Sequence, residues 1–351
     1  MSLPTIVTGM HRSGTSLTAS FIKAIGVDFG DNLLEGDRFN QKGYFEDVDF
    51  LEFQRSVLQK SCDRTDPGWH DWGWTQQETL DRRQFNQYEP EARSLIENRP
   101  KNGVWGWKDP RTTLMLDFWH QLLPEARYLF VYRQPWDVAD SILRLNSAIF
   151  SKHPDYALKA WAYYNRHLLQ FYQEHRDRCI LFNINSVLQQ PERLVELLED
   201  KLNFKLERRD RQRIFQQVFH PDLFKQLDPG HPFVQLLRTQ LPEYEQLLQE
   251  LDRNADIPSP FFPVAVPTET PLEKSAMLLH YRTLQAQMHQ QAIAHQWEQE
   301  KQQLHVHIAQ REAELAAVKG SRTWRAKEKV FQFKEAIASK LSVNLFANGK
   351  A

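Results

Sequence analysis

The chain has 351 residues, of which 41% are hydrophobic and 25% are charged, so it is long enough for about two folded domains and too apolar for a disordered protein. Its 44 Lys and Arg residues nearly balance its 45 Asp and Glu residues, which gives a formal net charge of −1. This balance excludes nucleic-acid binding driven by bulk positive charge. Any anionic ligand must therefore meet a local cluster of cations.

The cysteine count and the N-terminus point to an ordinary intracellular protein. Cys62 and Cys179 are too few for a disulfide framework or a cysteine zinc site, which favours a reducing compartment. The N-terminus has no basic region followed by an apolar stretch, and no run of about 18 apolar residues occurs, so we expect neither a signal peptide nor a membrane span. We therefore predict a cytoplasmic location.

Four short apolar runs predict buried strands, and they lie at 3–8, 104–107, 127–132 and 180–184. Helical patterns separate them, over 17–25, 50–58, 85–97, from about 112 to 123, 156–174 and 191–202, with a further helix that begins at Pro135. Strands that alternate with helices are typical of α/β domains. We therefore predict a P-loop-like parallel sheet flanked by helices, over residues 1–255.

The composition changes after residue 255. Five prolines between 258 and 271 predict a linker over 256–271. Residues 272–319 contain neither Gly nor Pro and are rich in Gln, Ala, Glu and Leu, which predicts a long helix. Its apolar heptad pattern is broken at Gln291 and His295, so a coiled coil and a homodimer through this helix stay open. The remainder, 320–351, is predicted to be a basic tail.

The strongest chemical signal is the loop Gly9–Ser16 (GMHRSGTS) between the first predicted strand and helix. Its glycines let backbone amides converge on an anion, and the helix N-terminus adds a partial positive charge. A Walker A loop carries Lys directly after its second glycine, where this chain has Thr15, and the loop cation is Arg12 instead. The clearest strand ends in Arg133 rather than in an Asp suited to magnesium. Both features count against a magnesium-dependent kinase.

The segment Arg12–Leu17 (RSGTSL) resembles the 5′-phosphosulfate loop of sulfotransferases that use 3′-phosphoadenosine 5′-phosphosulfate (PAPS). In that family, an Arg at a strand end and a Ser eight residues later bind the 3′-phosphate, and Arg133 and Ser141 have this spacing. Trp107–Arg111 (WKDPR) resembles the Lys-Asp-Pro segment of tyrosylprotein sulfotransferases. The resemblance covers roughly residues 3–205. It implies a parallel sheet that binds PAPS at the carboxyl ends of its strands.

The resemblance also implies a role for each of these residues. Arg12 and Lys108 would stabilise the sulfonate and the leaving oxygen, and no metal is expected. Arg133 would grip the 3′-phosphate bidentately, with Ser141 as a second donor. The backbone amides that would hold the 5′-phosphate are those of Ser13, Gly14, Thr15 and Ser16. The alternative for Lys108 is a purely structural loop, closed by a salt bridge within Lys108–Arg111.

The acceptor hydroxyl needs a base within hydrogen-bond reach. The acidic stretch before the second predicted helix offers Asp31, Glu35, Asp37, Glu46 and Asp47. Glu46 is the first choice, because it stands where a Glu-bearing loop returns in related enzymes, and Glu35 is the second. The alternative for Glu46 is that it only caps the helix that follows.

The chain departs from cytosolic sulfotransferases at three points. Leu17 replaces their adenine-stacking Trp, Asp109 replaces their catalytic His, and their Arg-Lys-Gly segment near the C-terminus is missing. The chain is thus more similar to the tyrosylprotein and carbohydrate branches, so we expect a hydroxylated acceptor such as a carbohydrate or glycolipid. Two alternatives stay open, namely a P-loop kinase-like phosphotransferase and a non-catalytic scaffold with a helical interaction segment.

Overall fold

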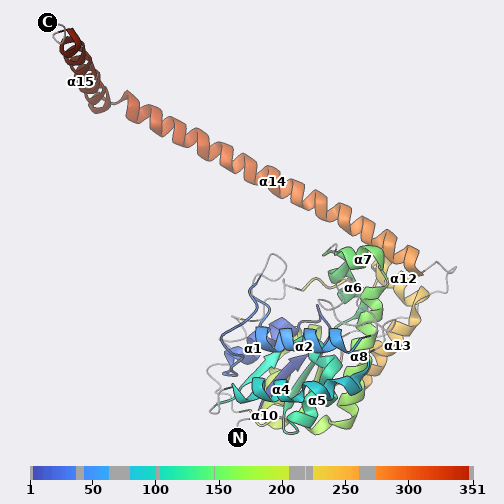
Figure 1. Cartoon of the computed structure of the whole chain (residues 1–351). Helices are drawn as coiled ribbons and strands as arrows, with labels where there is room; N and C mark the ends of the chain where they lie inside the picture. The colour runs from blue at the N-terminus through green and yellow to red at the C-terminus, as the bar shows by residue number, and fades with distance from the viewer. Residues whose placement is uncertain are drawn as a thin grey trace. The chain divides into compact units, whose positions relative to one another are not determined.

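The computed structural model describes residues 3–36, 43–62, 80–99, 103–145, 147–204, 218, 224–260 and 274–347. The chain divides into two compact units, Met1–Ala286 and Gln287–Ala351. The first unit is an α/β structure around a four-stranded parallel sheet, and the second is helical (Figure 1). The predicted fold class, with a long helix after the α/β domain, is thus confirmed.

The sheet has the strand order β2-β1-β3-β4. Its strands are Gly106–Lys108, Thr5–Thr8, Arg127–Tyr132 and Cys179–Asn183, in that order across the sheet. All neighbours pair in parallel, with Ile6 opposite both Trp107 and Tyr128. Because the strands run in parallel, their carboxyl ends meet at one edge of the sheet, where ligands bind in open α/β folds.

Alternate strand residues pack into two separate hydrophobic clusters. Ile6 and Phe130 belong to one cluster, whereas Val7 and Val131 belong to the other. Helices cover both faces, which explains why the strands are nearly continuous apolar runs rather than alternating ones. The first cluster includes residues of α2 (Val48–Lys60), α4 (Glu89–Glu97), α5 (Leu116–Leu122), α6 (Pro135–Leu143), α7 (Ala148–Lys152), α8 (Tyr156–Glu174), α12 (Pro232–Gln240) and α13 (Pro242–Asn254). The second includes residues of α1 (Thr15–Ala24), α9 (Ile184–Gln189) and α10 (Pro191–Asp200).

Prolines account for several helix boundaries that differ from the predicted ones. The predicted helix over 85–97 is a 3-10 helix, η1 (Arg82–Tyr88), followed by α4, which has proline in its first turn. The stretch predicted as helix from about 112 is first a 3-10 helix, η2 (Pro110–Met115), and then α5. Helices α12 and α13, which the sequence analysis did not predict, also begin with proline. Proline fits the first turn of a helix, because the amide hydrogen that it lacks has no partner there. A third 3-10 helix, η3 (Arg176–Arg178), precedes β4.

The C-terminal part of the chain forms two long helices, α14 (Lys274–Gly320) and α15 (Arg322–Ala347). The segment predicted only as a basic tail is therefore helical over most of its length. The Ser321 hydroxyl between the helices accepts a hydrogen bond from the amide of Trp324 and caps α15. Residues 261–273, and with them most of the predicted linker, lie outside the described residues. None of the helices in the described part of the chain combines the length and the apolar composition that crossing a membrane requires.

The pairing of β1 with β2 requires a residue without a side chain at Gly106. A Cβ atom there would lie 1.8 Å from the backbone oxygen of Thr5. We expect Gly106→Ala to lower the free energy of unfolding by about 1–3 kcal/mol, because the two strands must separate to admit the methyl group. Gly103→Asn is the matched control, since Gly103 has open space around it and Asn is among the residues that a positive φ strains least. Urea unfolding followed by tryptophan fluorescence measures both variants, and equal losses would contradict this explanation.

Candidate active site

The loop between β1 and α1 turns sharply where the chain leaves the sheet. Gly9, Arg12 and Gly14 have φ angles of 146°, 65° and 98°. A Cβ atom on Gly9 would lie 2.1 Å from the carbonyl oxygen of Val131, so only glycine lets the loop lie against β3. Gly14 is the N-cap of α1 and provides no side-chain acceptor, which leaves the first amides of this helix available to an anion.

Ser13 lies inside this loop and is fully buried. Within the described part of the chain, its hydroxyl oxygen has no hydrogen-bond partner. A buried polar group without a partner costs about 1–3 kcal/mol, so such a group in an amide-rich loop fits a phosphate oxygen as its missing partner. The neighbouring Ser16 donates instead to the carbonyl oxygen of Tyr44, at 3.3 Å. This contact ties the loop to the segment that carries Glu46.

The structure brings together the loop cation and the two residues predicted to bind a 3′-phosphate. Arg12 Nε donates to Ser141 Oγ at 3.0 Å, and Arg133 Nη1 donates to the carbonyl oxygen of Arg12 at 3.3 Å. Arg133 directly follows β3 and Ser141 lies in α6. Both are buried, with 3% and 6% of their surface exposed. The three residues therefore form one cluster at the carboxyl edge of the sheet.

A distant segment, residues 224–227, covers Arg133. The guanidinium group lies over the ring of Phe224, 5.1 Å from its centroid, and its Nη2 donates to the carbonyl oxygen of Lys225. Asp137 lies 3.6 Å from Arg133 Nε and accepts a hydrogen bond from the amide of Leu227. Burial lowers the pKa of Arg133, and Asp137 opposes this effect. The sequence analysis did not predict this cover, because residues 224–227 contain no motif that points to a contact with Arg133.

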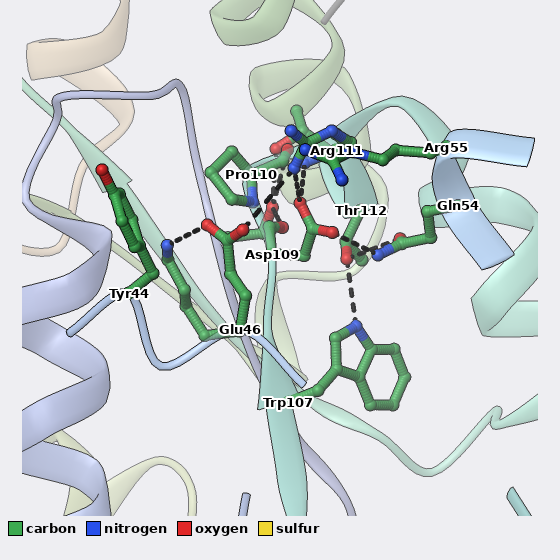
Figure 2. Close-up of polar contacts among 12 residues, drawn as sticks. Tyr44, Glu46, Gln54, Arg55, Trp107, Asp109, Pro110, Arg111 and Thr112 are labelled. Carbon is green, nitrogen blue, oxygen red and sulfur yellow. Dashed lines mark hydrogen bonds and ion pairs between the residues drawn. The ribbon is translucent and has the colours of Figure 1, made fainter. Parts of the chain in front are cut away.

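Lys108 and Glu46, which were predicted to have separate roles, form a buried ion pair. Lys108 Nζ lies 2.6 Å from Glu46 Oε1, and Arg111 Nη1 lies 3.7 Å from Glu46 Oε2 (Figure 2). All three side chains are at least 94% buried. Arg111 also pairs with Asp109 at 3.0 Å, so a salt bridge does close the Lys108–Arg111 segment. Lys108, however, pairs with Glu46, the first candidate for the base, which lies outside this segment.

The helix-capping alternative for Glu46 is wrong. The N-cap of α2 is Asp47, whose carboxylate accepts hydrogen bonds from the amides of Asp49 and Phe50 at 3.0 and 3.3 Å. Asp47 also pairs with Arg99 at 2.7 Å, so this residue has a structural task of its own. The second base candidate, Glu35, is exposed, and Asp37 lies outside the described residues.

A buried hydrogen-bond network holds the Lys108–Arg111 segment in place (Figure 2). Gln54 Nε2 donates to Asp109 Oδ2 at 3.0 Å, and Gln54 Oε1 accepts from Thr112 at 2.8 Å. Trp107 Nε1 in turn donates to Thr112 Oγ1. Each of these polar groups is buried and paired, so the network fixes the orientation of Asp109 and, through it, of Arg111. Gln54 lies in α2, about 55 residues away, and no sequence motif predicted this contact.

His11, in the loop after β1, is close enough to the cations of both parts of the site for their charges to act on it. Burial lowers the pKa of His11 well below its usual value, and the positive charges of Arg111, Lys108 and Arg12 lower it further. The imidazole is therefore neutral at physiological pH. Arg12 from one part of the site and Lys108 and Arg111 from the other thus all act on His11. The arrangement suits an anion with several oxygens, next to a carboxylate that can accept a proton.

No group of three or more His, Cys, Asp and Glu side chains in the described ranges is placed to hold a metal ion.

No curated protein sequence matches the chain. Three similar solved structures are the sulfotransferase domain of the olefin synthase from Synechococcus PCC 7002, the sulfotransferase domain from the curacin biosynthetic pathway and the sulfotransferase STF9 from Mycobacterium avium. Their sequence identities are 16%, 15% and 15%, and their TM-scores are 0.40, 0.39 and 0.40. The matches cover 71%, 72% and 73% of this chain and 95%, 98% and 77% of the others.

The family comparison covers every residue that the sequence predicted for the site. The model of the sulfotransferase family matches residues 4–208, more than half of the chain. This range includes the loop after β1, the Lys108–Glu46 pair, Arg133 and Ser141. The chain therefore belongs to the sulfotransferase family.

Proposed function

We propose that the chain transfers the sulfuryl group of PAPS to a hydroxyl group of a carbohydrate, glycolipid or similar acceptor. The observation that carries this proposal is the cluster of Arg12, Arg133 and Ser141 beside the amide-rich loop. A nucleotide with phosphates at both its 3′ and 5′ positions needs two such groups of donors at a fixed separation. Family membership supports sulfuryl transfer and counts against the kinase-like and scaffold alternatives.

Donor binding would exchange contacts that the protein now makes internally. The loop amides of residues 13–16 and the Ser13 hydroxyl would hold the 5′-phosphate. Arg133 now donates to two backbone carbonyls, and Ser141 accepts from Arg12. Those carbonyls are neutral, whereas a phosphate carries the opposite charge and can accept two parallel hydrogen bonds from Arg133, so the exchange is favourable. Arg12 is then released from Ser141 and turns toward the transferring group.

The chemical step depends on electrostatic stabilisation by positive charge and needs no covalent intermediate with the protein. The acceptor oxygen bonds to sulfur while the bond from sulfur to the bridging oxygen breaks, so negative charge develops on the leaving phosphate. PAPS supplies the activated sulfonate for this step. Arg12 and Lys108 are the cations that we assign to the sulfonate and the leaving oxygen. Lys108 is buried, and the low dielectric around it strengthens this stabilisation.

Glu46 is the base that we propose for the acceptor hydroxyl. In the structure, its carboxylate is occupied by the ion pair with Lys108, at 2.6 Å. When Lys108 turns to the sulfonate, Glu46 loses this partner and can accept the hydroxyl proton. Arg111 stays bound to Asp109 and keeps the carboxylate in place. The Lys108–Glu46 pair thus couples donor binding to activation of the base.

The nucleotide assignment predicts selective loss of affinity. We expect the wild-type chain to bind 3′,5′-ADP in the micromolar range and to show no such binding of ATP with magnesium. Arg133→Ala and Ser141→Ala should weaken 3′,5′-ADP binding about 10- to 100-fold and several-fold, respectively, and leave AMP binding nearly unchanged, because only the former nucleotide has a 3′-phosphate. Calorimetric titration measures all three ligands.

Arg127→Ala provides the control for this titration. Arg127 begins β3 at the opposite edge of the sheet and stacks on Phe204, so its loss should leave nucleotide affinity unchanged. Equal losses of 3′,5′-ADP and AMP affinity in Arg133→Ala would contradict the 3′-phosphate role. Preferential binding of ATP with magnesium would contradict the proposed function itself.

The base assignment predicts a loss in the chemical step alone. Glu46→Gln should lower kcat about 10²- to 10⁴-fold, because it removes the proton acceptor. Its affinity for 3′,5′-ADP should stay within a few-fold of the wild-type value. Transfer of radiolabelled sulfate from PAPS to an acceptor found by screening glycans measures kcat, with Glu35→Gln as the matched control. Loss of activity in Glu35→Gln with full activity in Glu46→Gln would overturn the assignment.

A further inference from the structure

Helix α14 exposes a stripe of large apolar side chains in the second unit. Their exposed fractions run from 46% to 68%, and the residues are Trp297, Leu304, Ile308, Leu315 and Val318. They are separated by seven, four, seven and three residues, which places them along one side of the helix. Single exposed apolar residues are common on protein surfaces, but five aligned along one side of a helix mark a surface that another molecule covers.

The spacing of the stripe is that of a coiled-coil seam. In heptad notation, the d positions are Trp297, Leu304, Arg311 and Val318, and the a positions are Lys301, Ile308 and Leu315. The two charged seam residues have acidic partners on their own helix. Arg311 pairs with Glu314 at 2.9 Å, and Lys301 lies 3.7 Å from Glu298. Charged residues in a seam lower stability, but they specify which register and which number of chains is allowed.

We infer that residues 293–320 pair with the same residues of a second copy of this chain, in a parallel and in-register coiled coil. In this arrangement, each g position faces the following e position of the other helix. Glu314 then faces Lys319 of the second copy, Glu300 faces His305, and His307 faces Glu312. The flanks of the seam are therefore complementary to themselves, which is the property that a homodimer requires.

An antiparallel pair fits the same stripe less well. The register that keeps the apolar layers together places Trp297 opposite Leu315 and Leu304 opposite Ile308. The flanks then bring Glu298 against Glu312 and Glu300 against Glu314. Lys301 and Arg311 oppose cations across the seam in both orientations, so only the flanks differ. Like charges across a flank are repulsive, and the flanks therefore select the parallel orientation. The seam ends where α14 ends, because Ser321 caps a separate helix directly after it.

The oligomeric state of the full chain tests the seam. We expect sedimentation analysis to give a dimer at micromolar concentration, and the double variant Leu304→Glu, Leu315→Glu to give a monomer. Val306→Glu is the matched control, because Val306 is apolar and 69% exposed but occupies position f, away from the seam. It should remain dimeric. A monomeric wild-type chain, a dimeric double variant or a monomeric Val306→Glu would each overturn the inference.

An engineered disulfide between two copies of the chain tests the parallel orientation of their helices. In a Cys62→Ser background, where only the buried Cys179 remains, oxidation should crosslink Val318→Cys into a covalent dimer. In the antiparallel register, the two introduced thiols would lie about 36 Å apart, since each residue adds about 1.5 Å along a helix. Ala317→Cys, one position away and outside the seam, should crosslink much less. Failure of Val318→Cys to crosslink, or equal crosslinking of Ala317→Cys, would overturn the parallel arrangement.

Discussion

Parallel pairing of β1 with both β2 and β3 is the constraint on which the whole site depends. It ends three strands at the same edge, so that Lys108, the loop after Thr8 and Arg133 meet there, although they are far apart in the sequence. Gly9 completes this arrangement, because any side chain at this position would collide with the backbone of β3. The chemistry of the site is thus a consequence of strand order and of one close backbone approach.

The cations of the site are held by partners inside the protein. Lys108 pairs with Glu46, and Arg133 is held by two backbone carbonyls and by Asp137. A buried cation without a partner would cost several kcal/mol, so these internal partners allow a cluster of positive charge in a chain with a net charge of −1. An anionic ligand must replace them, and this exchange favours ligands whose own charges match the separation of the cations.

The sequence predicted those parts of the site that depend on a local pattern. The loop after β1 was predicted from its glycines and its place between a strand and a helix, and the pair Arg133 and Ser141 from the resemblance to sulfotransferases. The alternation of apolar runs with helical patterns predicted the sheet. Glu46 could not be assigned in this way, because Asp47 beside it satisfies a capping pattern equally well, and only the fold shows that Asp47 is the cap. The hydrogen bond between this cover and Arg133 left no signal in the sequence, since Arg133 donates to the backbone carbonyl of Lys225, which any residue type would provide.

Asp140 shows how the site is connected to the rest of the α/β unit. It directly precedes Ser141 in α6, is fully buried and accepts a hydrogen bond from Tyr281 in the first turns of α14. Its other carboxylate oxygen lies 2.9 Å from Arg144 and 3.7 Å from Lys225, whose backbone carbonyl holds Arg133. One carboxylate therefore links α14 to the segment that covers the arginine. Because these contacts share one buried charge, the strength of the Tyr281 contact depends on how closely Arg144 and Lys225 approach the same carboxylate.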